Sequence, residues 1–293
     1  MKASDFLFHR PSTVEEAVGL LAEYNGDARI LAGGQSLMPM MNLRLARPAS
    51  LIDICDLEAL KEIRVEGEET VLGAMVRYRR IEEDPVIAER LPALPHLLHW
   101  VGDRQVRNRG TIGGALVQAD PTGEMALAAI VLGARLKVTG RRGTRILPAE
   151  GFYIGSYATA LARDEMVLEV IYPRQPRLFS FFEVNRRHND FAVVSVFAVG
   201  DRDETGAWSG IRIGLGGVDE TPVLAHEAMR ALFGGDLTDE AIQAAADAAA
   251  AEINPASDIR ASEDYRRHLA RIYVARALRA LRNGGVAAER ETV

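Results

Sequence analysis

Two glycine pairs, Gly33-Gly34 and Gly113-Gly114, are the residues of this chain whose placement most clearly indicates chemistry. Each pair lies where a short apolar run would end or a helix would begin. Glycines at such points leave successive backbone N–H groups unobstructed, and those groups form a concavity that binds anions. Two such loops could hold a diphosphate from both sides. The same residues also fit two ordinary tight turns, and the residues alone leave both interpretations open.

Other nucleotide-binding motifs do not fit the sequence. The chain contains no Gly-x-x-x-x-Gly-Lys-Ser/Thr phosphate loop. Residues 214–219 begin like a dinucleotide fingerprint after a predicted strand, but Asp219 stands where the third glycine belongs. No helix is predicted to open there either, so we interpret this segment as structural.

The remaining reactive side chains predict no catalytic machinery. His96 and His99 are the only two histidines close in sequence, and no acidic ligand adjoins them, so we expect core or surface histidines rather than a metal site. Cys55 is the single cysteine, which excludes an internal disulfide and an iron–sulfur cluster held by this chain. Because it lies in an apolar run, we expect a small buried side chain rather than a nucleophile.

The elements that position the first glycine pair can be predicted from local signals. Ser12 with Glu15 reads as a capping box, which predicts a helix from about residue 14 that Asn25-Gly26 would stop. The apolar run 28–31 predicts a strand ending at the glycine pair, and 50–54 predicts a second strand.

Further along, the pattern changes character at two prolines. Strands are predicted at 70–74, 134–138 and 164–172 and helices at 78–87 and 126–132. Pro173 and Pro176 then disrupt both helix and sheet and mark a boundary. Beyond it we expect two strands at 191–199 and 208–215 and two long helices at 239–252 and 262–282.

Composition excludes several classes of protein. The chain has 293 residues, 48% apolar and 26% charged, with a net charge of -6, which argues against a nucleic-acid binder. No stretch approaches the roughly 18 apolar residues of a transmembrane helix, and the N-terminus lacks the apolar run of a signal peptide. We therefore expect a cytoplasmic protein without a membrane span or a metal of its own.

Longer stretches around the glycine pairs resemble a known family. Residues 32–37 together with 105–114 are similar to the FAD-binding medium subunit of molybdenum hydroxylases, of which carbon monoxide dehydrogenase and xanthine dehydrogenase are types. Residues 119–121, 186–192 and 258–267 extend the likeness, in order, over nearly the whole chain.

The resemblance implies an α+β fold in two parts. Residues 1–176 would form an FAD-binding domain of the PCMH (vanillyl-alcohol-oxidase-like) type, with subdomains of about 1–57 and 58–176. Residues 177–293 would form a small α+β domain with an antiparallel sheet and helices.

It also implies the cofactor-binding residues. Glu124 matches the position of an Asp that contacts a sugar hydroxyl, which leaves Asp120 to shape the turn before Pro121. Glu183 stands where the family often has a Lys, so a positive charge near the flavin is absent there or supplied otherwise. The expected FAD contacts are Ile30, Leu31, Ala32, Gly33, Gly34, Gln35, Ser36, Thr111, Gly113, Gly114, Ala115, Glu124, Val167 and Phe191.

The activity that the resemblance implies is electron transfer through non-covalent FAD. A large partner would hold the molybdenum cofactor and a small partner two [2Fe–2S] clusters, in a dimer of heterotrimers that delivers electrons to an external acceptor. Two alternatives remain: a stand-alone FAD-dependent oxidase or reductase of the same fold, and a cofactor-free structural subunit. The first would require a substrate-facing base, and the second has no need of intact glycine pairs.

Overall fold

The N-terminal residues form a parallel sheet, because short apolar runs alternate with helices that serve as crossovers. In the computed structural model, which describes residues 2–187, 189–204, 206–285 and 290–292, the strand order is β1-β3-β2. Ala17, Val18 and Leu21 of the first helix share a small core with Ile52. The elements are β1 (Leu7–His9), α1 (Val14–Glu23), β2 (Ala28–Leu31), α2 (Leu37–Asn42) and β3 (Ser50–Asp53).

Helix α1 is capped one residue later than the sequence predicted. Thr13, not Ser12, is the N-cap, and its hydroxyl accepts the backbone N–H of Glu16. The Glu16 carboxylate in turn accepts the N–H of Ser12 at 2.7 Å. The predicted Ser12–Glu15 pairing is therefore wrong by one position, because Thr13 and Glu16 satisfy the same motif.

The middle of the chain builds a five-stranded antiparallel sheet of order β4-β5-β10-β6-β7. The 3₁₀ turn η1 (Glu58–Leu60) leads into it, and β8 (Tyr153–Gly155) and β9 (Ala158–Thr159) form a separate hairpin. The strands of the five-stranded sheet are β4 (Ile63–Glu66), β5 (Glu69–Gly73), β6 (Arg135–Gly140), β7 (Gly143–Pro148) and β10 (Met166–Tyr172). The helices of this middle part of the chain are α3 (Tyr78–Glu83), α4 (Pro85–Arg90), α5 (Ala93–Leu98), α6 (Arg104–Arg109), α7 (Ile112–Gln118) and α8 (Glu124–Val131).

The helix predicted at 78–87 is two helices. Asp84 ends α3 with extended backbone and caps α4 by accepting the N–H of Val86. Pro85 then occupies the first turn of α4, where its missing N–H is tolerated. A helix running through this point would lose one backbone hydrogen bond at the proline, so the chain restarts instead.

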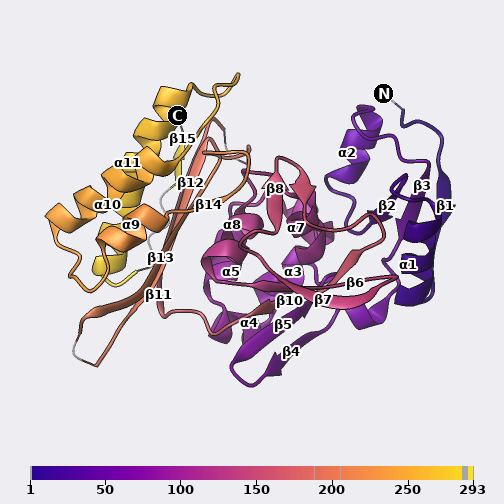
Figure 1. Ribbon diagram of the computed structural model, residues 1–293, viewed down its shortest axis with the longest axis horizontal. Helices are drawn as coiled ribbons and strands as arrows, with labels where there is room; N and C mark the ends of the chain where they lie inside the picture. Colours follow the sequence, from indigo (N-terminus) through magenta and orange to yellow (C-terminus); the bar gives the residue numbers. More distant parts are fainter. Residues whose placement is uncertain (1, 188, 205, 286–289, 293) are drawn as a thin grey trace.

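The C-terminal part is a second five-stranded sheet, of order β14-β13-β12-β11-β15, with helices covering its outer face (Figure 1). Phe182 and Val184 of β11 join the core under these helices, whereas Phe181 faces the core shared with α8. The elements are β11 (Leu178–Asn185), β12 (Val194–Arg202), β13 (Trp208–Gly216), β14 (Val223–Leu224), α9 (His226–Ala231), α10 (Asp239–Glu252), α11 (Glu263–Arg282) and β15 (Arg290–Thr292).

These sheets and helices confirm the predicted α+β class. In the described part of the chain, none of the helices combines the length and apolarity that crossing a bilayer requires. The two parts meet across α8, which is apolar on nearly every side and packs against β12 and β13 of the C-terminal sheet. The middle of the chain thus lies between the parallel sheet and the C-terminal part (Figure 1).

Candidate functional site

The first glycine loop, residues 32–36, joins β2 to α2 and lies against the chain that precedes α7. A Cβ on Gly33 would overlap the carbonyl oxygen of Arg109, so only glycine permits this approach. Gly34 has a φ of +72°, in the left-handed region that favours glycine. The Cys55 thiol donates to the carbonyl oxygen of Ala32 at 3.3 Å and fixes the start of the loop.

This loop offers unused backbone N–H groups. Within the residues that the structure describes, the N–H groups of Gly34, Gln35 and Ser36 have no hydrogen-bond acceptor. The Gln35 side chain turns back to the carbonyl of Gly33 at 3.2 Å and so leaves the outer side of the loop open. Successive free N–H groups in a left-handed turn fit the anion-binding concavity that the sequence allowed for this loop.

The second glycine pair is used differently, and the expectation of free N–H groups there is wrong. The N–H of Ile112 donates to Val76, that of Gly113 to Ala74, and that of Gly114 to the Thr111 hydroxyl. A Cβ on Gly113 would lie 2.6 Å from the Cβ of Ala74, so this glycine allows α7 to pack against the turn after β5. Gly113 is therefore buried and sets how closely α7 approaches the turn after β5, so it exposes no surface of its own.

Gly114 brings the two loops together. A Cβ on Gly114 would lie 3.6 Å from the Cβ of Ala32, so the N-terminal end of α7 adjoins the first loop. Gly114, Ala115 and Gln118 make a partly exposed strip of mostly small side chains along α7. The Gln118 amide reaches the Met40 sulfur at 3.4 Å, which joins α7 to α2 a turn further on.

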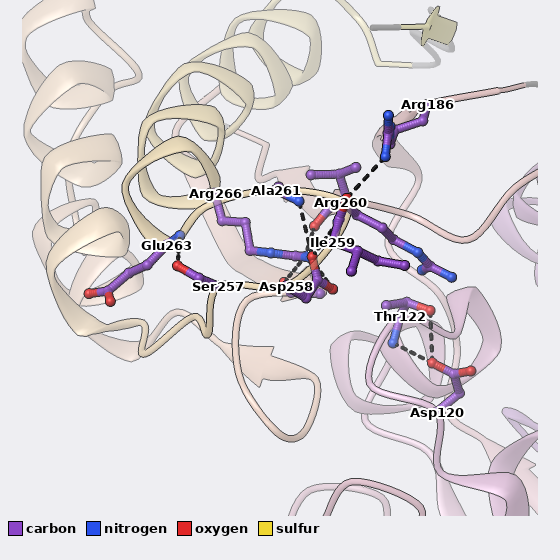
Figure 2. Close-up of polar contacts among 12 residues, drawn as sticks. Asp120, Thr122, Arg186, Ser257, Asp258, Ile259, Arg260, Ala261, Glu263 and Arg266 are labelled. Carbon is purple, nitrogen blue, oxygen red and sulfur yellow. Dashed lines mark hydrogen bonds and ion pairs between the residues drawn. The ribbon is translucent and has the colours of Figure 1, made fainter.

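The two carboxylates after α7 lie in different surroundings. One oxygen of Asp120 accepts both the N–H and the hydroxyl of Thr122, at 2.9 and 2.7 Å, and so holds the turn (Figure 2). Its other oxygen accepts the Tyr157 hydroxyl at 3.4 Å. The prediction that Asp120 shapes the turn before Pro121 is confirmed.

Glu124 opens α8, and its carboxyl group is enclosed although the residue as a whole keeps some exposure. Burial raises the pKa of Glu124 to about 7, and the negative charge of Asp120 adds to the shift. No side-chain hydrogen bond joins this carboxyl group to another described residue. A hydrogen bond from the Glu124 backbone N–H partly offsets the rise, and α8 packs against α7.

Phe191 and Val167 have contrasting environments. Phe191 lies in the loop before β12 and is 56% exposed, and the predicted strand at 191–199 begins only at Val194. The Arg260 guanidinium lies 5.0 Å from the centre of the Phe191 ring. Val167 is buried in β10, the strand on which α7 packs.

Glu183 is fully buried in β11, and the Asn185 amide donates to it at 2.6 Å. Since it alternates with the helix-facing Phe182 and Val184, it lies on the side of the sheet that faces the FAD-binding part. The position at which the family often has a Lys thus carries a buried carboxylate in this chain.

The remaining reactive residues form no second site. Burial raises the pKa of the Cys55 thiol to about 11, which keeps it protonated and unreactive. His96 packs edge-on against Phe179, and burial lowers its pKa. Over the described ranges, no cluster of His, Cys, Asp and Glu side chains could hold a metal ion. Sequence reasoning missed Arg260 and Tyr157, whose roles depend on contacts between distant segments.

Two family descriptions match the chain in succession. "FAD binding domain in molybdopterin dehydrogenase" matches residues 3–175, and "CO dehydrogenase flavoprotein C-terminal domain" matches residues 179–281. The chain belongs to the FAD-binding medium subunits of molybdenum hydroxylases. As such it is an oxidoreductase subunit.

Relatives of this family resemble the chain over nearly its full length. It is 39% identical to the carbon monoxide dehydrogenase medium chain of Hydrogenophaga pseudoflava, over 94% of this chain and 96% of the relative. It is 32% identical to the nicotine 6-hydroxylase medium subunit of Paenarthrobacter nicotinovorans, over 95% of this chain and 98% of that one.

Solved structures agree with this assignment. A carbon monoxide dehydrogenase from Hydrogenophaga pseudoflava that lacks the Mo-pyranopterin moiety matches with a TM-score of 0.94 and 39% identity, over 98% of this chain and all (100%) of that chain. Quinoline 2-oxidoreductase from Pseudomonas putida 86 matches with a TM-score of 0.92 and 34% identity, over the same shares. The fold expected of an FAD-binding domain followed by a C-terminal domain is confirmed.

Proposed function

We propose that this medium subunit binds FAD non-covalently and passes electrons from the [2Fe–2S] clusters of a small partner subunit to an external acceptor. A large partner that holds the molybdenum cofactor would oxidise the substrate. Bound FAD supplies the redox chemistry, since flavins carry electrons that no protein side chain here can carry. The protein holds the cofactor, keeps water away from it and sets its electrostatic surroundings.

The free N–H groups of the first loop are the observation that carries this proposal. We assign the diphosphate to the N–H groups of Gly34, Gln35 and Ser36, because an anion would satisfy donors that the protein leaves unused. Ala32 and the preceding residues Ile30 and Leu31 carry the loop, and Gly33 lets it approach Arg109.

The second loop and α8 supply the rest of the cradle. Thr111 adds a hydroxyl donor, while Gly114 and Ala115 leave room along α7, and Gly113 sets the depth of that helix. The remaining assignments follow the family positions: Glu124 to a sugar hydroxyl, Val167 to an apolar wall and Phe191 to the isoalloxazine ring.

No described residue is arranged as an acid–base catalyst beside this cradle. Glu124 has a pKa near neutrality, but its place at the sugar position suits hydrogen bonding to a hydroxyl group. This supports an electron relay over a stand-alone oxidase or reductase, which would need a base facing its substrate.

Visible absorption of the purified chain tests the proposal. We expect flavin bands from the native protein and release of the flavin on denaturation, because the contacts are non-covalent. A correctly folded, colourless chain would contradict FAD binding. Oxidation of an organic substrate by the isolated chain with dioxygen would instead contradict the relay and favour the oxidase.

For the assembly, we propose a dimer of heterotrimers with the large and small partners, located in the cytoplasm. Relatives named as medium chains or medium subunits support the heteromeric part of this proposal. Co-expression with the genes of candidate partners, followed by native mass spectrometry, would give the composition, and a chain that stays alone would contradict it.

A further inference from the structure

Arg260 is a positive charge at the junction of the two domains for which the structure describes no counter-ion. Its guanidinium makes no ion pair within the described ranges, although Arg266 and Arg267 nearby are both paired. Instead it lies 5.0 Å from the centre of the Phe191 ring, a distance at which a cation is attracted to an aromatic face. A half-buried, unpaired cation of this kind calls for an anionic or electron-rich neighbour.

The segment that carries Arg260 is held rigidly (Figure 2). One oxygen of Asp258 accepts the N–H groups of Arg260 and Ala261 at 2.8 and 3.0 Å, and the other pairs with Arg266 at 2.8 Å. The Arg186 guanidinium donates to the carbonyl of Ile259 at 3.0 Å. The backbone at Arg260 is therefore held by Asp258 of its own segment and by Arg186 of a distant one.

Arg266 anchors this segment to the C-terminal sheet. Its buried guanidinium donates to the carbonyl oxygens of Val193 and Gly217, at 2.5 and 2.8 Å, while it pairs with Asp258. Because Val193 follows closely after Phe191 in the chain, Arg266 holds both the segment that carries Arg260 and the loop that carries Phe191.

The Arg260 side chain extends toward the other domain. Figure 2 shows it running from the C-terminal segment toward the turn that contains Asp120 and Thr122. Burial and Asp120 raise the pKa of the Tyr157 hydroxyl, whereas the charge of Arg260 lowers it, so Arg260 and Tyr157 share this region. The cation thus lies on the side of the C-terminal segment that faces the Asp120 turn, at the C-terminal end of α7.

The position along α7 decides which part of the cofactor Arg260 would meet. The free N–H groups lie at the N-terminal end of α7 and the Asp120 turn at its C-terminal end. A helix of this length spans about 10 Å, so a molecule whose diphosphate sits on the glycine loops would present a more distant group to Arg260. In FAD both the adenine and the isoalloxazine ring lie at such a distance from the diphosphate. Because Arg260 lies over Phe191, which we assign to the isoalloxazine ring, we assign Arg260 to that ring as well.

We propose that Arg260 supplies the positive charge beside the isoalloxazine ring and raises the reduction potential of the bound flavin. This inference rests on the proposed function, since it requires FAD on this site. Electron uptake adds negative charge to the flavin, and a nearby cation in a partly enclosed site stabilises that charge. Glu183, at the position where the family often has a Lys, is a buried carboxylate, so we assign the positive charge to Arg260 of the C-terminal segment.

Charge-changing variants of the full-length, FAD-loaded chain test the proposal. Arg260→Gln should lower the midpoint potential of the bound flavin, measured by reduction in equilibrium with reference dyes. Arg260→Lys should retain most of the wild-type value because it keeps the charge. Arg79→Gln is the matched control, since Arg79 pairs with Glu83 on the surface of α3, and its potential should equal that of the wild type.

The outcomes separate this inference from the proposed function. An Arg260→Gln chain that binds FAD with unchanged affinity and unchanged potential would overturn it. Loss of FAD from folded Arg260→Gln but not from Arg260→Lys would support a direct cation contact. Absence of FAD from the wild-type chain would contradict the proposed function itself.

Discussion

Glu124 opposes folding through its buried carboxyl group, and under the proposed function it would favour cofactor binding. Its carboxyl group has a pKa of about 7 instead of 4.5, so the folded chain binds more protons than the unfolded chain between these values. Stability therefore falls as the pH rises through this window. Since one pKa unit corresponds to about 1.36 kcal/mol, the cost above neutral pH is on the order of 3 kcal/mol. A hydroxyl donor from a bound cofactor would offset part of it.

We predict opposite effects of Glu124→Gln on stability and on FAD binding. The neutral amide removes a buried charge, so the free energy of unfolding of the FAD-free chain should rise by about 1–3 kcal/mol at pH 8 and change little near pH 4. Loss of a charged acceptor should weaken FAD binding by about 1–3 kcal/mol. Urea unfolding at both pH values and fluorescence titration with FAD would measure the two effects.

Glu83→Gln is the control for this change, because Glu83 pairs with Arg79 on an exposed helix surface. It should alter neither quantity by more than about 0.5 kcal/mol. Equal stability of wild-type and Glu124→Gln chains at pH 8 would contradict the conclusion that the Glu124 carboxyl group is buried and charged at that pH.

At the level of elements, the two glycine pairs illustrate what the sequence can and cannot predict. Their resemblance to a family identified both loops, and helix α10 was predicted with its observed bounds. Which glycine faces a ligand depends on distant neighbours: Gly113 meets Ala74, and Gly33 meets Arg109. No local pattern contains that information. Strand β11 was not predicted because both of its faces are buried, which removes the alternation of apolar and polar residues.

We predict that Gly113→Ala destabilises the chain through packing and not through loss of a ligand contact. The new Cβ would lie 2.6 Å from the Cβ of Ala74, so the free energy of unfolding should fall by about 1–3 kcal/mol even without FAD. Gly19→Ala is the matched control, since nothing lies within 4 Å of a Cβ there in α1. It should stabilise the chain by about 0.5–1 kcal/mol. Urea unfolding of both FAD-free variants measures these changes. A Gly113→Ala chain with an unchanged free energy of unfolding would contradict the close packing of α7 against Ala74.

At the scale of the whole molecule, α8 joins the two domains into one packed body. The core that surrounds it includes Phe181 and Phe197 of the C-terminal sheet. Gly214 lets β13 approach the side chains of Leu127 and Val131. Gly214, the first glycine of the segment that resembled a dinucleotide fingerprint, therefore serves this contact, in agreement with the structural interpretation of segment 214–219. The packing around α8 thus fixes the C-terminal sheet against the FAD-binding part.

We predict that Arg212 is a polar link on which this junction depends. Its guanidinium donates to the carbonyls of Val131 and Ile130 at the C-terminal end of α8, at 2.6 and 2.9 Å. A cation there also opposes the negative end of the helix dipole. Arg212→Met should cost about 1.5–3 kcal/mol and lower the midpoint of thermal unfolding by several degrees, measured by calorimetry without FAD. Arg79→Met, which removes only a surface ion pair, should leave the midpoint nearly unchanged. Equal midpoints for the two variants would contradict the link, whereas splitting of a single transition into two in Arg212→Met alone would show that α8 makes the domains unfold together.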